Sequence, residues 1–172
     1  WGVQLEALSY ASSLIPTSGT AVTRNQDLCT NGGSASLINS EEGVLYAEMF
    51  NVKSGRIGII NGSTDRVAIY FGGIGGTRIQ LVYKANGVTS LHNIDPLSPQ
   101  GLFKLAIKWN ASNVYFYVNG VLEQTTAISN LLSALNQLTF YVDNLGIVGE
   151  TKCLAVWKEA LSDAELTALT TI

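Results

Sequence analysis

Short apolar runs separated by Asn-Gly and Gly-Gly pairs are the feature of this sequence that most restricts its fold. Between these runs, Asn-Gly occurs at residues 61–62, 86–87 and 119–120, and Gly-Gly at 72–73 and 75–76. An Asn-Gly pair between two apolar runs favours a tight β-hairpin, because a type I′ turn needs a positive φ at both central residues. Alternating strand–helix units are absent, which excludes a nucleotide-binding α/β fold.

The runs between these turns carry the two-residue period of a β-strand. In residues 43–52, for example, Val44, Tyr46, Glu48 and Phe50 alternate with Leu45, Ala47 and Met49. The predicted strands are 43–52, 56–61, 66–71, 78–84, 103–109, 114–118, 137–142 and 152–157. Many short strands at this spacing predict an all-β sandwich or barrel.

The C-terminal end is the exception and predicts one short helix. Ser162 and Glu165 have the spacing of a capping box, and Leu161 and Leu166 have that of a hydrophobic staple. We expect the helix to end near residue 170 and to turn Leu166 and Leu169 toward the sheets.

Length and charge exclude several classes of protein. The 172 residues fit one domain, and charged residues make up only 13% of the chain, with a net charge of −3. A nucleic-acid-binding protein would carry a basic field, which this chain lacks. We find neither an apolar run of 18 residues nor a cluster of five or more Lys and Arg. A transmembrane helix and a polybasic membrane anchor are therefore not expected.

Two segments of the chain resemble a known family. Residues 103–109, followed by 114–122 with the turn sequence Tyr-Val-Asn-Gly, resemble the paired strands of laminin-G-like domains. Residues 153–166 resemble their last strand and closing helix. These domains belong to the concanavalin A-like lectin/glucanase superfamily. The resemblance implies an all-β, two-sheet antiparallel jelly-roll sandwich with one short C-terminal helix.

The N-terminal part resembles a join found in phage appendage proteins and some bacterial surface proteins. Residues 2–17 and 22–27 carry this likeness, and Pro16 lies in a small, polar segment typical of a linker. The likeness implies an arm, or a remnant of an upstream domain, over residues 1–19 and a jelly-roll domain over 20–172. It also implies a location on a virion, or outside the cell or on its surface.

The resemblance does not extend to catalytic residues. Glucanases of the superfamily carry Glu-x-Asp-x-x-Glu on one strand, because cleavage needs two carboxyl groups across the sugar. This sequence has no such motif, and Glu41, Glu42 and Glu48 do not replace it. Its one histidine, His92, is predicted in a loop. We therefore expect no enzymatic activity.

Metal and disulfide sites have weaker support. Members of the superfamily often bind calcium at the rim of the sandwich, and Asp143 and Asn144 lie in a predicted turn that could supply oxygen ligands. The alternative is that both side chains stabilise the turn itself. Cys29 and Cys153 could form one disulfide or remain two buried thiols.

Polar and aromatic residues on the outward phase of the predicted strands form a candidate ligand surface. The set is Arg66, Tyr70, Arg78, Gln80, Lys84, Tyr115 and Tyr117. If these strands share a sheet, the residues form a basic, aromatic patch suited to an anionic or neutral polysaccharide. The alternative is an ordinary solvated β-surface, since cross-strand tyrosines also stabilise sheets without any ligand.

Three functions follow, in this order. The first is a non-catalytic carbohydrate-recognition module of a phage tail or bacterial surface protein, with a cell-surface glycan as its partner. The second is a structural module that contacts other domains or copies of its parent protein. The third is a polysaccharide-cleaving enzyme.

Overall fold

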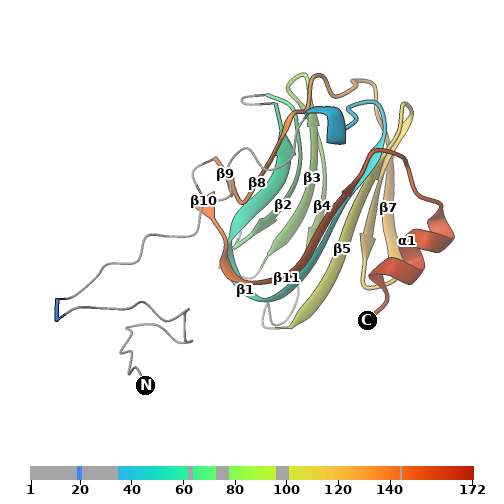
Figure 1. Cartoon of the computed structure of the whole chain (residues 1–172). Coiled ribbons are helices and arrows are strands. Elements are labelled where there is room, and N and C mark those ends of the chain that lie inside the picture. Colours follow the sequence, from blue (N-terminus) through green and yellow to red (C-terminus); the bar gives the residue numbers. More distant parts are fainter. Residues whose placement is uncertain (1–18, 21–34, 62–63, 73–77, 96–100, 144) are drawn as a thin grey trace.

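The computed structural model describes residues 19–20, 35–61, 64–72, 78–95, 101–143 and 145–172. The strands are β1 (Gly43–Ile60), β2 (Arg66–Phe71), β3 (Ile79–Ala85), β4 (Val88–Ile94), β5 (Leu102–Trp109), β6 (Asn113–Val118), β7 (Val121–Ala127), β8 (Gln137–Thr139), β9 (Tyr141–Val142), β10 (Leu145–Gly146) and β11 (Val148–Trp157). The helices are a 3-10 turn (Ala35–Leu37) and α1 (Asp163–Thr170). The predicted all-β sandwich with a C-terminal helix is confirmed (Figure 1).

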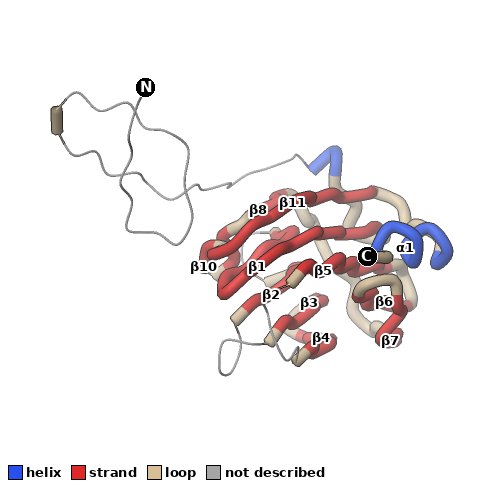
Figure 2. The backbone as a smooth tube through the Cα atoms, turned by 90° about the horizontal axis from the view of Figure 1, so that it is seen from below, coloured by secondary structure: helices blue, strands red, loops and turns tan. Residues whose placement is uncertain are grey.

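Two antiparallel sheets form the sandwich, and β1 belongs to both. We call the sheet with the order β4-β3-β2-β1-β8 sheet A, and the sheet with the order β11-β1-β5-β6-β7 sheet B. Residues 55–60 of β1 pair with β2 and β8, whereas residues 43–50 pair with β5 and β11. Figure 2 shows the strands arranged around a common interior, with α1 on the outside.

A bend within β1 lets one strand serve both sheets. Sequence periodicity predicts two strands here, 43–52 and 56–61, but the chain continues as one strand. Asn51 and Gly55 take positive φ angles of 50° and 120° at the bend. The pairing with β11 shifts register between Phe50 and Ser54. Turn-like residues therefore produce a corner between the sheets rather than an end of the strand.

The core lies between the sheets. Ile57, Ile69 and Leu81 of sheet A pack with Leu45 and Phe116 of sheet B, all five without solvent exposure. Burial of such large apolar side chains is the main stabilising contribution to a sandwich of this size. Residues on the opposite phase of the same strands face outward, and these outer faces carry the candidate site.

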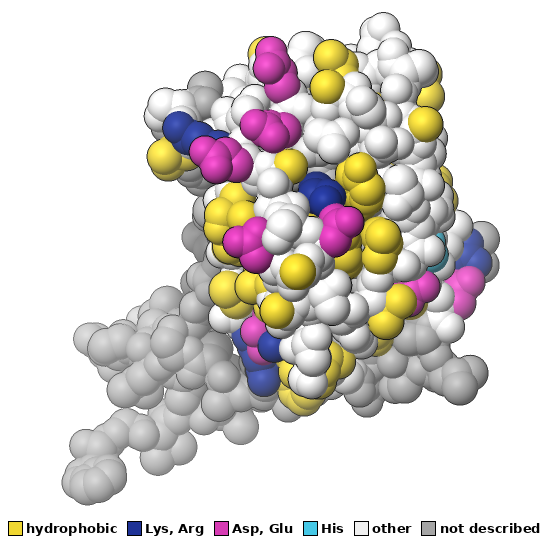
Figure 3. Space-filling model, turned by 90° about the vertical axis from the view of Figure 1, so that its right-hand side faces the viewer, with side chains coloured by type: hydrophobic (Ala, Val, Ile, Leu, Met, Phe, Trp, Pro, Cys, Tyr) yellow, Lys and Arg dark blue, Asp and Glu magenta, His cyan; other side chains and the backbone are white. Residues whose placement is uncertain are grey.

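Helix α1 covers part of the outer face of sheet B. The predicted capping box between Ser162 and Glu165 is present, and Leu166 is fully buried against Tyr46 and Tyr117. Most of the molecule's surface on this side consists of uncharged side chains and backbone, as the low charge content predicts (Figure 3). Within the described ranges, no helix is long and apolar enough to cross a bilayer.

An ion pair joins α1 to the sheet and yields a first prediction. Asp163 accepts hydrogen bonds from the ammonium of Lys108, a residue that is only 7% exposed, and from the Tyr117 hydroxyl at 2.8 Å. The Lys108 and Tyr117 donors lower the pKa of Asp163 from its ordinary 3.8. Because the Asp163 side chain is itself largely exposed, we expect Asp163→Asn to lower the free energy of unfolding by only about 1 kcal/mol.

The test of this prediction is urea denaturation at two pH values. A lowered pKa in the folded state stabilises above pH 3.8, and this contribution is lost as the pH falls through the lowered value. The difference between Asp163→Asn and the unmodified chain should therefore shrink at acid pH. Glu159→Gln, at an exposed acid just before the helix, is the control and should leave stability unchanged. An equal effect of both variants would contradict the role given to Asp163.

Candidate functional site

The outer face of sheet A gathers five of the seven predicted ligand residues. Strand register arranges the residues of this face in three rows that run across β1, β2, β3 and β4. The first row is Arg56, Tyr70, Gln80 and Asn93. The middle row is Gly58, Ala68, Val82 and Leu91, and the third row is Ile60, Arg66, Lys84 and Thr89. Arg78 directly precedes β3 and lies beside the first row. Tyr70, Gln80, Arg66, Lys84 and Arg78 therefore share one face, as the alternation pattern predicts.

Planar polar side chains run along the first row. Arg56 stacks on the Tyr70 ring with its guanidinium carbon 4.3 Å from the ring centre. The Gln80 amide donates to the Asn93 side-chain oxygen at 2.8 Å. These pairs hold amide and guanidinium groups in fixed positions at the surface, where they can donate to and accept from a bound molecule.

An arginine–aspartate pair lies beside this row, where β3 begins and β4 ends. Arg78 donates to both oxygens of Asp95, from Nε at 2.7 Å and from Nη2 at 3.2 Å. The hydrogen bonds from Arg78 lower the pKa of the Asp95 carboxyl. The pair has the two-pronged geometry in which arginine recognises a carboxylate.

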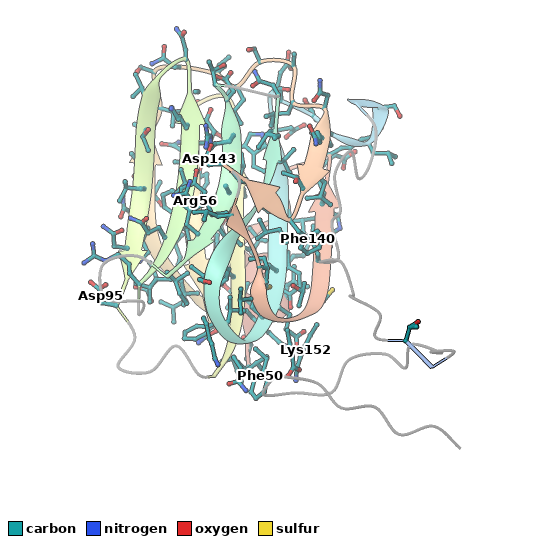
Figure 4. All side chains as sticks on the ribbon, turned by 90° about the vertical axis from the view of Figure 1, so that its left-hand side faces the viewer. Phe50, Arg56, Asp95, Phe140, Asp143 and Lys152 are labelled. Carbon is teal, nitrogen blue, oxygen red and sulfur yellow. The ribbon has the colours of Figure 1, made fainter. Side chains whose placement is uncertain are left out.

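Arg56 and a second arginine, Arg66, converge on one carboxylate. Figure 4 shows Arg56 and Asp143 close together on this face. Nη1 of Arg56 and Nη1 of Arg66 each donate to Oδ2 of Asp143 at 2.5 Å. Arg66 also donates to the Tyr70 hydroxyl at 3.1 Å. Asp143 lies in the turn between β9 and β10, with a φ of 51°. The β9–β10 hairpin therefore brings an acidic side chain onto the outer face of sheet A.

Tyr115 and Tyr117 do not join the other five residues. Both belong to β6, which pairs with β5 and β7 in sheet B. They therefore lie on the outer face of sheet B, on the opposite side of the sandwich from the other five residues. Tyr117 is fully buried beneath α1, and the Lys108 ammonium lies 4.2 Å from the centre of the Tyr115 ring. The alternation of a strand shows which of its side chains face outward, but it does not show which of the two sheets the strand joins. The prediction therefore placed Tyr115 and Tyr117 on the same face as the other five residues.

The predicted calcium ligands have a different environment from that of a metal site. The Asp143 oxygen already accepts from two cationic groups, and Asn144 lies outside the described residues. In the part of the chain that the structure describes, no three His, Cys, Asp or Glu side chains are grouped to hold a metal ion. Calcium binding stays a prediction without support from this face.

The histidine lies in a strand and not in the predicted loop, whereas the predicted pairing of the two cysteines stays a prediction. Cys153 is an exposed free thiol on β11, and Cys29 lies outside the described residues, so the structure does not show a disulfide. His92 lies in β4, not in a loop. Its Nδ1 is 3.0 Å from the Gln124 side-chain oxygen, and its ring stacks on Phe116. These contacts turn His92 toward the space between the sheets and away from the outer face of sheet A.

Sequence reasoning missed two members of the site, Arg56 and Asn93. Arg56 was within a predicted strand, and its alternation with Ile57 would have placed it outward. Asn93 was missed because β4 is an edge strand whose residues are all half-buried or exposed. Such a strand lacks the clear apolar alternation from which a strand is predicted.

Comparison with known proteins identifies the fold but no family. No family model matches the sequence, and no curated protein matches it. Solved structures do match. A carbohydrate-binding module, CBM40, of the Ruminococcus gnavus IT-sialidase, bound to α2,3-sialyllactose, has a TM-score of 0.61 and 13% identity. The match covers 83% of this chain and 94% of the module.

A second similar structure comes from a different enzyme. Domain 4 of AbnA, a GH43 extracellular arabinanase from Geobacillus stearothermophilus in complex with arabinotriose, has a TM-score of 0.63 and 14% identity. The match covers 81% of this chain and 70% of that structure. At these identities the comparisons establish the fold alone. The chain has the jelly-roll sandwich fold found in carbohydrate-binding modules, in agreement with the concanavalin A-like resemblance of its sequence.

Proposed function

We propose that the chain is a non-catalytic carbohydrate-recognition module and that the outer face of sheet A binds the glycan. The observation that carries the proposal is the continuous row of Arg56, Tyr70, Gln80 and Asn93, flanked by Arg66 and Arg78. Sugar hydroxyls both donate and accept hydrogen bonds, and fixed amide and guanidinium groups on a rigid sheet match that need with little loss of side-chain entropy.

The ligands of the similar structures support this choice. One is bound to sialyllactose and the other to arabinotriose, so both present oligosaccharide sites on a sandwich of this type. They differ in sugar, and one of the two sugars is acidic. The fold therefore suits glycan binding in general, and the residues of this chain must decide which glycan it takes.

The acidic residues of this face support a binding role rather than cleavage. A glycosidase needs one carboxyl with a raised pKa to protonate the leaving oxygen. Arg78 instead lowers the pKa of Asp95, and Asp143 is held by two guanidinium groups. His92, the one histidine of the chain, is turned toward the interior. The pairing with Arg78 favours an Asp95 carboxylate that stays charged, and such a group does not protonate a leaving oxygen.

The proposed biological setting is the surface of a bacterium or a phage particle. The N-terminal resemblance to phage appendage and bacterial surface proteins supports it, and so does the laminin-G-like character of residues 103–122. A domain at such a site meets the host's or neighbour's surface glycans directly. Contacts with other domains or copies of the parent protein fit the same setting.

The experiment is a glycan-array screen of the purified chain, followed by calorimetric titration of the strongest oligosaccharide. Arg56→Ala is expected to weaken binding at least about tenfold, because it removes a hydrogen-bonding group of the row and the partner that stacks on Tyr70. Lys152→Ala is the matched control. Lys152 also lies over an aromatic ring, 4.9 Å from the centre of Phe50, and Phe50 belongs to the sheet B part of β1 (Figure 4).

The two variants separate the candidate functions. Loss of binding in Arg56→Ala with full binding in Lys152→Ala supports a glycan site on sheet A. Equal loss in both would place the site elsewhere. A blank array at high protein concentration would favour the structural module, and release of shorter sugars from a bound polysaccharide would favour an enzyme.

A further inference from the structure

We propose that Asp143 is an internal ligand of a carboxylate-binding site formed by Arg56 and Arg66, and that this site takes a carboxylated sugar such as a uronic acid. The inference rests on the proposed function, because it names the class of glycan for the same face. It adds that the chain's own carboxylate occupies the position that the carboxylate of the sugar must take.

The first argument is the geometry of the two arginines. They lie on neighbouring strands, two rows apart, yet both direct Nη1 to the same oxygen of Asp143 at 2.5 Å. Between them lie Gly58 and Ala68, and a Cβ atom at Gly58 would come within 2.7 Å of the Ala68 side chain. Because these two residues are small, the side chains of Arg56 and Arg66 can approach each other above the sheet. Their meeting point is a binding position for one carboxylate.

The second argument is the exposure of the three side chains. Arg66 is 11% exposed and Arg56 is 27% exposed, whereas Asp143 is 43% exposed. The arginines therefore form the base of the site and Asp143 lies on its solvent side. A carboxylate arriving from solvent meets Asp143 first and competes with it for the same donors.

The third argument is that Asp143 can leave while its hairpin stays. Val142, next to Asp143, is only 2% exposed. On the return strand, the Gly146–Ile147 backbone packs directly against Gly55. These contacts fix the hairpin on both sides of the turn. Rotation of the short Asp143 side chain toward solvent is then enough to open the site, since staggered rotamers of an exposed side chain interconvert rapidly.

The chemistry of the neighbouring row selects a sugar rather than a simple anion. Two guanidinium groups around one carboxylate give strong, directional hydrogen bonds. A sugar ring extending from that carboxylate meets the Tyr70 hydroxyl and the amides of Gln80 and Asn93 in the adjacent row. A carboxylate and several hydroxyls on one ring are the defining groups of acidic sugars.

The test compares an acidic and a neutral sugar in three proteins. D-Glucuronate and methyl β-D-glucopyranoside are titrated into the unmodified chain, Asp143→Asn and Asp163→Asn, with binding followed by ¹H–¹⁵N NMR. Removal of an internal competitor raises the apparent affinity of the ligand. We expect Asp143→Asn to bind glucuronate about tenfold more tightly, which is about 1.4 kcal/mol, and to bind the neutral glucoside unchanged.

Asp163→Asn is the matched control, because Asp163 is also a carboxylate paired with a cation, Lys108, but lies on α1 over sheet B. Its glucuronate affinity should equal that of the unmodified chain. Adding Arg56→Ala to Asp143→Asn should abolish the gain. Equal or weaker glucuronate binding by Asp143→Asn, or the same gain for both sugars, would overturn the inference. Absence of glucuronate binding to Asp143→Asn would also overturn the inference. If the array shows a neutral glycan in that case, the proposed function still stands.

Discussion

Replacing Gly55 by alanine is expected to lower the free energy of unfolding by about 4 kcal/mol, the sum of backbone strain and a steric clash. Gly55 has a φ of 120°, a conformation that residues with a side chain rarely adopt. A Cβ atom at this position would also collide with the carbonyl oxygen of Gly146 and lie 2.5 Å from the Cα of Ile147. Neither neighbour is a flexible side chain, so the β9–β10 hairpin would have to move.

Gly87→Ala is the control that separates strain from clash. Gly87 lies in the Asn-Gly turn between β3 and β4 with a φ of 81°, and no atom lies within 4 Å of a Cβ placed there. This variant should cost about 1 kcal/mol, from backbone strain alone. Chemical denaturation of both variants measures the difference. If Gly55→Ala lowered the free energy of unfolding no more than Gly87→Ala, the β9–β10 hairpin would not pack closely against β1 as we describe.

Replacing Asp65 by asparagine is expected to lower the free energy of unfolding by about 3 kcal/mol, because buried donors lose a charged acceptor. Asp65 is only 3% exposed. Its carboxylate accepts from the backbone N–H groups of Asn86 and Ser133, both at 2.8 Å, and from the Ser133 hydroxyl at 3.0 Å. One side chain therefore joins the β1–β2 connection, the β3–β4 turn and the segment between β7 and β8.

The same site makes stability depend on pH. Burial by itself would raise the pKa of Asp65, but the donors of Asn86 and Ser133 outweigh it, and the pKa lies below the ordinary 3.8. The unfolded chain therefore binds the proton first. The contribution of Asp65 is complete above pH 3.8 and is lost as the pH falls through the lowered folded-state value.

Denaturation at neutral and acid pH tests both statements about Asp65. Asp65→Asn should be much less stable than the unmodified chain at neutral pH, and this difference should narrow in acid. Asp95→Asn, which changes an exposed ion pair, should cost less than about 1 kcal/mol. Similar losses in the two variants, or a loss in Asp65→Asn that does not depend on pH, would contradict the role assigned to this carboxylate.

The candidate site was predictable in its residue types and only partly in its assembly. Period-two alternation placed Arg66, Tyr70, Gln80 and Lys84 on one outward face, because neighbouring strands joined by short turns share a sheet. It also assigned Tyr115 and Tyr117 to that face, which is wrong because their strand belongs to sheet B. The pattern reports inside or outside for each strand, and it does not report which sheet the strand joins.

The partnership of Asp143 with the two arginines could not be read from the sequence. Asp143 is 87 residues from Arg56 and 77 residues from Arg66, and turn chemistry alone explains an aspartate before Asn144. The contact arises because β8 pairs with β1 and directs the next hairpin onto sheet A. The acid that holds the arginines was thus predicted as a metal ligand.

The sequence by itself determined the local features of this protein. The Asn-Gly turns, the alternating strands and the capped C-terminal helix depend on φ preferences, side-chain periodicity and hydrogen bonds within a few residues, and all of these are properties of short segments. Tertiary structure alone decided that β1 bends into both sheets, that β4 forms an edge strand, and that Asp143 meets Arg56 and Arg66. These features depend on pairing between distant strands, where the burial of the whole core, and not local preference, selects the arrangement.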